Sequence, residues 1–521
     1  MKTWRVIPPL AVLLGVSFGP VLGQQDAGPT AATHPQPAAA AESLNGFDEY
    51  VRMVMEEFNI PGVAVAAIQD GEVVISKGWG YRNVEKQLPM TDETLLAIGS
   101  NSKSFTAMVL GTLVDEGKIE WDEPVKTYLP DFNLYDDAAE EAMTVRDIIS
   151  HRSGLPRHDR LWSHRSTTRQ EIFERLQYLE PTVTHRARWQ YQNLMFLTAG
   201  LLGARVTGKS WEENVRERIF EPLGMYRSNF SVDDSQRDPN HALPYQTRDD
   251  VVQAIPFHNI DEIGPAGSIN SSVDMMIRYI QMNIDQGVYN GKRIISEEVA
   301  REMQIPHSQI PGEPDFEKKE GYGGYGLALW VTTYQGRKMV RHGGGIDGFI
   351  SQMAWMPHAK IGVMVLTNYS GFNPVPNMLM HNVFDRLLGV EEVDWFAAAK
   401  ENRERARTAR EEREKKRADE RHEGTSPSHV WANYAGTYEH PAYGTVVMHA
   451  RQAGLHMVMD QWSGNLNHYH YDVFEVEADG PGQAINNMLV SFGYTKEGEV
   501  DRFMMPLETN VADIVFTRRK D

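Results

Sequence analysis

Apolar and polar positions recur along the chain with a period that changes from segment to segment. Apolar residues at positions 44, 47, 51, 54 and 58 follow helical spacing and predict a helix over residues 42–58. The runs GVAVAAIQ (62–69) and EVVISKGWGYR (72–82) flank Asp70-Gly71, which predicts a β-hairpin. Residues 97–118 (AIGSNSKSFTAMVLGTLVDEGK) return to the helical period and predict a buried helix.

The middle of the chain differs in character from the segments on either side of it. Residues 121–256 show helical periods broken by turns such as HRSGLP at 151–156. Four β-rich runs follow at 326–334, 338–342, 349–356 and 361–367. We therefore predict an α+β fold: an antiparallel sheet built from both ends of this region, flanked by helices and carrying a helical insertion.

The last quarter of the chain consists of a charged segment and a β-rich tail. Residues 396–424 are dense in Arg, Lys and Glu, and the interspersed Glu residues favour a solvated helical linker over a nucleic-acid-binding patch. From residue 430 onward, short alternating runs such as GTVVMHA, LHMVMD and DIVFTR predict a small β-barrel or sandwich.

The first residues have the pattern of a targeting sequence. Lys2 and Arg5 precede an apolar stretch over 7–21, and VLG at 21–23 is an acceptable cleavage site. Residues 24–43, rich in Ala, Pro, Gln and Thr, predict a disordered leader. We therefore expect a protein exported to a bacterial periplasm or secreted, with no stable membrane anchor after signal cleavage.

Composition narrows the chemistry. The 521 residues include no cysteine, which excludes disulfides, thiol nucleophiles and thiolate metal sites. The formal net charge of −19 argues against nucleic acid and anionic membranes as partners. We expect neither a metal nor a cofactor.

Ser100 and Lys103 begin the helical stretch at 97–118. They stand three residues apart, so they share one face of the predicted helix. A hydroxyl at a helix N-terminus gains from the helix dipole, and an adjacent amine could take its proton. On this stretch alone, a serine N-cap followed by a solvated lysine is an equal alternative.

Two later motifs favour the catalytic interpretation of Ser100 and Lys103. Tyr191-Gln192-Asn193 stands about ninety residues after Ser100 in the helical insertion, and His342-Gly343-Gly344 follows at the end of a predicted strand. Similar triplets at 81–83, 268–270 and 422–424 lack the required order or context.

With IGSNSKSFTA, HRSGLP, WQYQN, GPAGSINSS and HGGGIDGF, the region from about 44 to 392 resembles the serine β-lactamase/penicillin-binding-protein superfamily. It is most similar to the class C-like hydrolases, which include D-aminopeptidases, D,D-carboxypeptidases and esterases. The tail, with YAGTYEHPAYGT and HYHYDVF, resembles an appended lipocalin-like barrel. The resemblance implies a hydrolase domain at 44–392 and a lipocalin-like domain at 428–521. We expect the charged segment between them to be a helical linker at 393–427.

The resemblance also implies roles for individual side chains. Ser100 would be the acylated nucleophile, Lys103 its proton acceptor and Tyr191 a second acid/base group. His342 would assist the Lys/Tyr pair or hold a substrate carboxylate. Each role depends on pKa values shifted by burial and by neighbouring charges.

Substrate-binding groups follow from the same resemblance. Asn193 would orient a substrate amide, and the backbone N–H groups of Ser100 and Gly345 would form the oxyanion hole. The glycines let the strand edge lie close to the substrate; they are Gly343, Gly344 and Gly345. Outside the motifs, we expect His151 to hold a loop, and His468 and His470 to be a packed or solvent-facing pair without metal.

One departure from the family pattern bears on substrate. A β-lactamase proper usually carries lysine where His342 stands, whereas histidine is commoner among the peptidases and esterases. We therefore expect a peptidase or amidase acting on a small-molecule or peptide substrate, with a preference for D-residues open. The alternatives are an esterase, lactonase or weak β-lactamase, and a penicillin-binding or scaffold protein without turnover. Self-assembly into a homo-oligomer is also open.

Overall fold

The computed structural model describes residues 42–163, 166–248, 251–315, 318–452, 454–480 and 484–520. The predicted signal peptide and nearly all of the predicted leader lie outside the described residues. In the described part of the chain, no helix is both long and apolar enough to cross a membrane.

The hydrolase-like region is organised around one antiparallel sheet, which confirms the predicted α+β fold. Among the described residues its strand order is β10-β11-β12-β13-β14-β15-β1-β2-β3. The strands from the two ends meet where β1 pairs with β15, with Val65 opposite Val365. The strand bounds are β1 (Gly62–Gln69), β2 (Glu72–Asn83), β3 (Leu88–Pro89), β10 (Ser308–Gln309), β11 (Gly324–Tyr325), β12 (Trp330–Tyr334), β13 (Arg337–Ile346), β14 (Phe349–Met356) and β15 (Ile361–Thr367).

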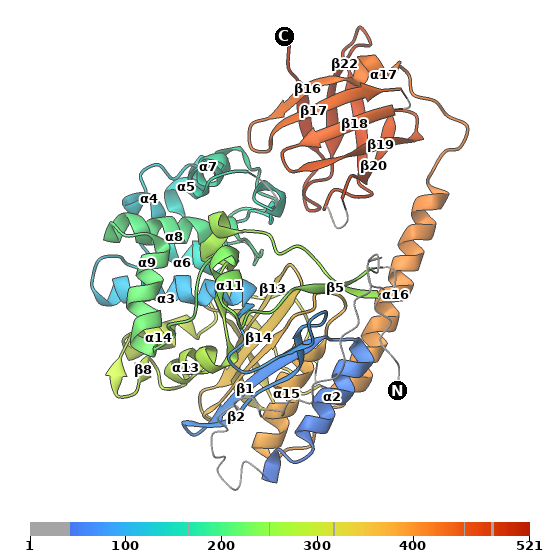
Figure 1. Cartoon of the computed structure of the whole chain (residues 1–521). Helices are drawn as coiled ribbons and strands as arrows, with labels where there is room; N and C mark the ends of the chain where they lie inside the picture. Colours follow the sequence, from blue (N-terminus) through green and yellow to red (C-terminus); the bar gives the residue numbers. More distant parts are fainter. Residues whose placement is uncertain are drawn as a thin grey trace, which may run out of the picture.

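Both faces of this sheet are covered, which explains the continuous apolar run of β1. Ala64 and Ala66 point into one core, and Val63 and Val65 point into the other. Because successive side chains of a strand alternate between faces, a strand covered on both sides needs apolar residues throughout. Helices α2 (Phe47–Phe58) and α15 (Val375–Leu388) belong to the second core, and α3 (Ser102–Asp115), α8 (Leu194–Thr207) and α13 (Val273–Ile284) belong to the first (Figure 1).

The predicted helical insertion is built of short elements. Several begin with a side-chain cap: Thr144 and Thr168 each form a capping box with the acidic residue three positions later. A β-hairpin, β5 (Tyr245–Arg248) with β6 (Val251–Ala254), was not predicted. The remaining α-helices and minor strands described between residues 96 and 303 are β4 (Leu96–Ala97), α4 (Val125–Tyr128), α5 (Asp137–Ala142), α6 (Val145–Ile149), α7 (Arg169–Glu174), α9 (Trp211–Val215), α10 (Glu221–Leu223), α11 (Val232–Arg237), α12 (Gly264–Gly267), β7 (Asn270–Ser271), β8 (Val288–Tyr289), β9 (Lys292–Arg293) and α14 (Glu297–Met303).

Two predicted strand boundaries were wrong. The strand expected at 326–334 begins only at Trp330, because a turn with Ala328 at φ 62° precedes it. The strand expected to end at His342 continues through the glycines to Ile346, since they pair with β14. The glycine motif therefore lies in the sheet.

The C-terminal segment forms a long helix and a closed barrel. Helix α16 (Trp395–Asp419) is exposed along most of its length and leads to the barrel, which lies at the top of Figure 1. Within the described residues the barrel has eight antiparallel strands and closes between β16 and β23, as predicted. Its elements are α17 (Trp431–Tyr434), β16 (Gly436–His440), β17 (Gly444–Arg451), β18 (Gly454–Met459), β19 (Trp462–His470), β20 (Val473–Ala478), β21 (Leu489–Tyr494), β22 (Val500–Met505) and β23 (Ile514–Arg518).

Candidate active site

Ser100 lies in a single 3-10 turn (Gly99–Asn101) immediately before α3. Gly99 adopts the left-handed conformation at φ 53°, and a Cβ there would lie 2.7 Å from the backbone N of Gly345. Asn101 Nδ2 donates to Ser351 Oγ at 2.8 Å, and that hydroxyl donates to the Ile98 carbonyl at 2.8 Å. The turn is thus fastened to β14, and only glycine fits where it meets β13.

Lys103 is fully buried one turn after Ser100. Its Nζ lies 3.1 Å from Ser100 Oγ and donates to the Ala266 carbonyl at 2.7 Å. Burial lowers the pKa of Lys103 well below its usual value, the charge of Arg157 lowers it further, and Asp159 opposes this in part. A neutral amine at this distance can accept the proton of Ser100.

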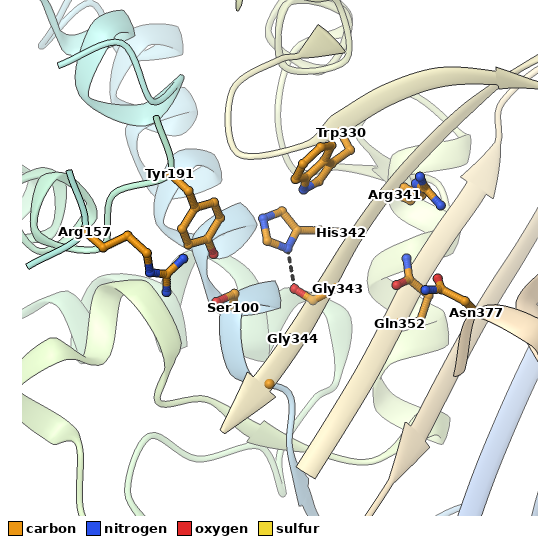
Figure 2. A pocket seen from close by; sticks show the side chains of 11 residues that line it. Ser100, Arg157, Tyr191, Trp330, Arg341, His342, Gly343, Gly344, Gln352 and Asn377 are labelled. Carbon is orange, nitrogen blue, oxygen red and sulfur yellow. Dashed lines mark hydrogen bonds between the residues drawn. The ribbon is translucent and has the colours of Figure 1, made fainter. Parts of the chain in front are cut away.

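The side chain of Tyr191 points its hydroxyl toward Ser100 (Figure 2). The Lys103 Nζ lies 4.8 Å from the centre of its ring. Burial raises the pKa of Tyr191, although a hydrogen bond with Ser100 and the charge of Arg157 both oppose the rise. Tyr191 is therefore a neutral phenol that can donate a proton rather than a phenolate base.

The HRSGLP turn holds the segment that carries Tyr191. The N–H of Gln190 donates to the His151 carbonyl at 2.9 Å, and the N–H of Gln192 donates to His151 Nδ1 at 3.0 Å. His151 thereby brackets Tyr191, and the two rings lie 4.3 Å apart. Burial lowers the pKa of His151 well below its usual value, so the ring is neutral and its Nδ1 can accept.

His342 is buried at the rear of the site and bonded at both nitrogens. Its Nδ1 lies 2.6 Å from the Gly343 carbonyl, which can only accept, so Nδ1 carries the proton. Nε2 is then free to accept the hydroxyl of Tyr325 at 3.0 Å. Burial, followed by the nearby Lys103 charge, lowers the pKa of His342 to about 3, so it offers no positive charge to a substrate carboxylate near neutral pH.

Strand β13, which carries the three glycines at 343–345, borders a pocket of about 410 Å³ that contains Ser100. Pairing of β12 with β13 ends at Trp330 opposite Arg341, which leaves the edge of β13 from His342 onward without a partner on that side among the described strands. A Cβ on Gly344 would lie 2.0 Å from the Ile98 carbonyl. An extended substrate can bind beside Ser100 only if β13 packs closely against the turn at 99–101 and keeps an unpaired backbone edge.

Arg157 and Asp159 join the site without having been predicted. Asp159 accepts from Asn193 Nδ2 at 2.7 Å and from Arg157 Nε at 2.6 Å. The Arg157 guanidinium lies over the Tyr191 ring, 4.8 Å from its centre. The signal was present, because these residues directly follow HRSGLP. Asn193 is thus committed to Asp159 in this structure.

The structure also places two other groups that the sequence analysis considered. The triplet at 268–270 packs behind the nucleophile turn, where the Ile98 N–H donates to the Ile269 carbonyl at 3.0 Å. His468 Nε2 lies 2.9 Å from the Tyr471 carbonyl. Over the described ranges, no group of three or more His, Cys, Asp or Glu side chains is arranged to hold a metal ion.

Comparisons with known proteins agree with this architecture. A family model described as "Beta-lactamase" matches residues 47–388, and one described as "Domain of unknown function (DUF3471)" matches residues 420–518. A curated protein named unguisins hydrolase ungD', from Aspergillus campestris, is 29% identical over 419 residues, which are 76% of this chain and 76% of that protein. Protein flp from Staphylococcus aureus is 21% identical over 65% of this chain and 66% of its own length.

Solved structures share the fold. An octameric penicillin-binding protein homologue from Pyrococcus abyssi aligns over 91% of this chain and 100% of its own, with a TM-score of 0.60 and 24% identity. The D-amino acid amidase from Ochrobactrum anthropi SV3 aligns over 67% of this chain and 96% of its own, with a TM-score of 0.55 and 24% identity.

Proposed function

The chain belongs to the beta-lactamase family, as its motifs predict, and we propose that it is a hydrolase that works through an acyl-enzyme on Ser100. The observation that carries the proposal is the Lys103 amine, buried and held 3.1 Å from Ser100 Oγ beside a protonated Tyr191. Environments that favour a neutral amine and a neutral phenol supply a base and an acid at the same hydroxyl.

Acylation proceeds in balanced steps. Ser100 Oγ attacks the substrate carbonyl and passes its proton to Lys103 Nζ as the new C–O bond forms. The backbone N–H groups of Ser100 and Gly345 stabilise the oxyanion. As the C–N bond or the ester C–O bond breaks, the proton from Lys103 reaches the leaving group by way of Tyr191.

Deacylation reverses the proton path. A water molecule attacks the acyl carbon, its proton passes to the Lys103/Tyr191 pair, and Ser100 Oγ leaves as the hydroxyl. His342 holds Tyr325 at the back of the site, and Asn193 orients the substrate when it exchanges its bond with Asp159. Neither step requires a metal or a cofactor.

We favour a peptide or amide substrate, with D-residues to be tested first. The open edge of β13 offers main-chain hydrogen bonds to an extended peptide, and His342 stands where β-lactamases usually carry lysine. The curated relative from Aspergillus campestris is, by its name, also a hydrolase. Esterase, lactonase or weak β-lactamase activity is the second candidate, because the same acyl chemistry serves it.

The test uses the purified full chain with a D-amino-acid anilide, its L-counterpart, a chromogenic ester and a fluorescent penicillin. We expect turnover of at least the anilide or the ester, and a covalent adduct on Ser100 detected by mass spectrometry. Ser100→Ala is the matched control and should show neither. If no substrate gives a Ser100-dependent product or adduct, the acyl-enzyme proposal is wrong; an adduct without turnover would support the penicillin-binding alternative.

Export and self-assembly are also proposals. Lys2, Arg5 and the apolar stretch that follows support export, and N-terminal sequencing of the mature protein tests it. The homologue from Pyrococcus abyssi is described as octameric, so light scattering of the mature protein is the measurement for oligomeric state.

A further inference from the structure

The barrel contacts the hydrolase region at the loop that carries Arg157 and Asp159. In an up-and-down barrel, alternate turns lie at the same end. The turns after β16, β18, β20 and β22 therefore share one end, and we call its described residues the barrel rim (441–443, 460–461, 479–480, 484–488 and 506–513). Hydrogen bonds join this rim to His158, Arg160 and Ser166.

His158 is the centre of this contact. It is only 2% exposed and adopts the left-handed conformation at φ 48°. Its backbone N–H donates to Glu508 Oε2 at 2.8 Å, and its Nδ1 lies 2.8 Å from the hydroxyl of Tyr443. Arg160 adds a bond to the Leu507 carbonyl at 3.0 Å.

The partners on the rim are themselves fixed. Glu508 is 5% exposed, and its second oxygen accepts from the backbone and side chain of Asn510 at 3.1 and 3.0 Å. Burial alone would raise the pKa of Glu508, but the hydrogen bonds from His158 and Asn510 hold it below the usual value. The carboxylate is therefore ionised and accepts from both sides.

The residues on either side of His158 act in the candidate active site. Arg157 lies over Tyr191, and Asp159 receives bonds from Arg157, Asn193 and Trp162. A displacement of about 1 Å in groups that position a reacting centre can cost a hundredfold in rate. The orientation of His158 consequently bears on both Tyr191 and Asn193.

We propose that the barrel, which the family comparison leaves without a function, positions the active-site loop 157–162 through the contacts of Tyr443 and Glu508 with His158. The inference rests on the proposed function for its catalytic consequence. Tyr443, Glu508 and His158 are positioning residues, because none of them lines the pocket around Ser100.

The test compares Tyr443→Phe and Glu508→Gln in the full chain with the control Tyr438→Phe. Tyr438 is an equally buried barrel tyrosine whose hydroxyl donates inside the barrel, to the Tyr434 carbonyl at 2.8 Å. We expect faster backbone hydrogen exchange in peptides covering 157–163 and a fall in kcat of about five- to tenfold, with KM changed less. The control should alter neither exchange in this loop nor kcat.

A double variant tests whether the barrel positions the loop through the contact between the His158 ring and Tyr443. His158→Gly tolerates the left-handed backbone and removes the ring together with its hydrogen bond to Tyr443. Combined with Tyr443→Phe, it should be no slower than the slower single variant, since both remove the same bond. If the losses of kcat in the two single variants add in the double variant, the contact between His158 and Tyr443 does not explain them.

The outcomes separate the two proposals. Unchanged exchange at 157–163 overturns the positioning role, and so does faster exchange with unchanged kcat. If the wild-type chain turns over no substrate, the proposed function is wrong, whereas the exchange comparison still decides whether the barrel holds the loop.

Discussion

Burial moves the pKa values of Lys103 and Tyr191 in opposite directions, and both groups become neutral beside Ser100. For Lys103 the charged form is disfavoured, and for Tyr191 the phenolate is disfavoured. Burying the Lys103 amine is unfavourable for folding, but it produces the neutral amine that can accept the proton of Ser100.

Replacing that amine should separate stability from activity. We expect Lys103→Met to lower the rate of Ser100 acylation by about 10³-fold, because the proton acceptor is lost. The melting temperature should stay the same or rise, since an apolar chain replaces a desolvated amine. Stopped-flow acylation and calorimetry measure the two effects; a strongly destabilised but active variant would contradict the assignment.

The acid limb of the pH–rate profile should report Lys103. Burial is the largest cause of its lowered pKa; the charge of Arg157 lowers that pKa further, and Asp159 opposes it. Tyr191, His151 and His342 also face the amine. In Arg157→Gln that pKa rises, so more of the amine is protonated at a given pH and the acid limb moves to higher pH. Initial rates from about pH 5 to 9 test the direction, and an unmoved or more acidic limb would exclude Lys103 as the base.

The glycines of β13 are not equivalent. A Cβ on Gly344 would lie 2.0 Å from the Ile98 carbonyl, whereas one on Gly343 would lie 3.1 Å from the flexible end of Gln352. We expect Gly344→Ala to cost about 1–3 kcal/mol of stability and to reduce activity by displacing the nucleophile turn. Gly343→Ala is the matched control and should lie within about 0.5 kcal/mol of wild type. Urea denaturation and kcat/KM compare them.

At the scale of elements, the HRSGLP turn at 151–156 fixes the segment that carries Tyr191. His151 binds the chain on both sides of Tyr191 while holding its own backbone at φ 59°. His151→Gly tolerates that conformation but has no side-chain acceptor, so the buried N–H of Gln192 is left without its partner. We expect a loss of about 1–3 kcal/mol and a lower kcat with a smaller change in KM.

His151→Ala is the companion variant for this prediction. It loses the same acceptor and adds backbone strain, so it should be less stable than His151→Gly. Equal kcat for His151→Gly and wild type would show that Tyr191 is positioned without this turn.

Elements with a strong local pattern could be predicted, and those set by distant partners could not. The apolar period of residues 97–118 gave α3, and the alternating tail gave the barrel. Strand β13 was predicted too short because glycines weaken a strand signal, and here pairing with β14 keeps them in the sheet. Ser100, Lys103, Tyr191 and His342 were predicted by motif. Arg157 and Asp159 follow HRSGLP in the sequence, but only their contacts with Tyr191 and Asn193 place them at the site.

At the scale of the whole molecule, the barrel is attached twice: by α16 and by its rim. The middle of α16 is exposed, and its ion pairs, such as Arg410 with Glu414, are of the surface kind that contribute little. Close to its ends, Arg403 binds Glu57 and Arg417 binds Glu475. The helix thus acts as a spacer that keeps the rim near the loop 157–162.

Cutting the spacer should therefore convert docking into a concentration-dependent equilibrium. With a specific protease site inserted near residue 408, we expect the cleaved protein to keep its kcat at high protein concentration and to lose it on dilution, since the tether no longer supplies a high effective concentration. The same cut in Tyr443→Phe should require a higher concentration for the same activity, because the rim contact is weaker. Uncut protein diluted in parallel is the control, and activity that survives dilution after complete cleavage and separation of the fragments would show that the hydrolase region needs no contact with the barrel.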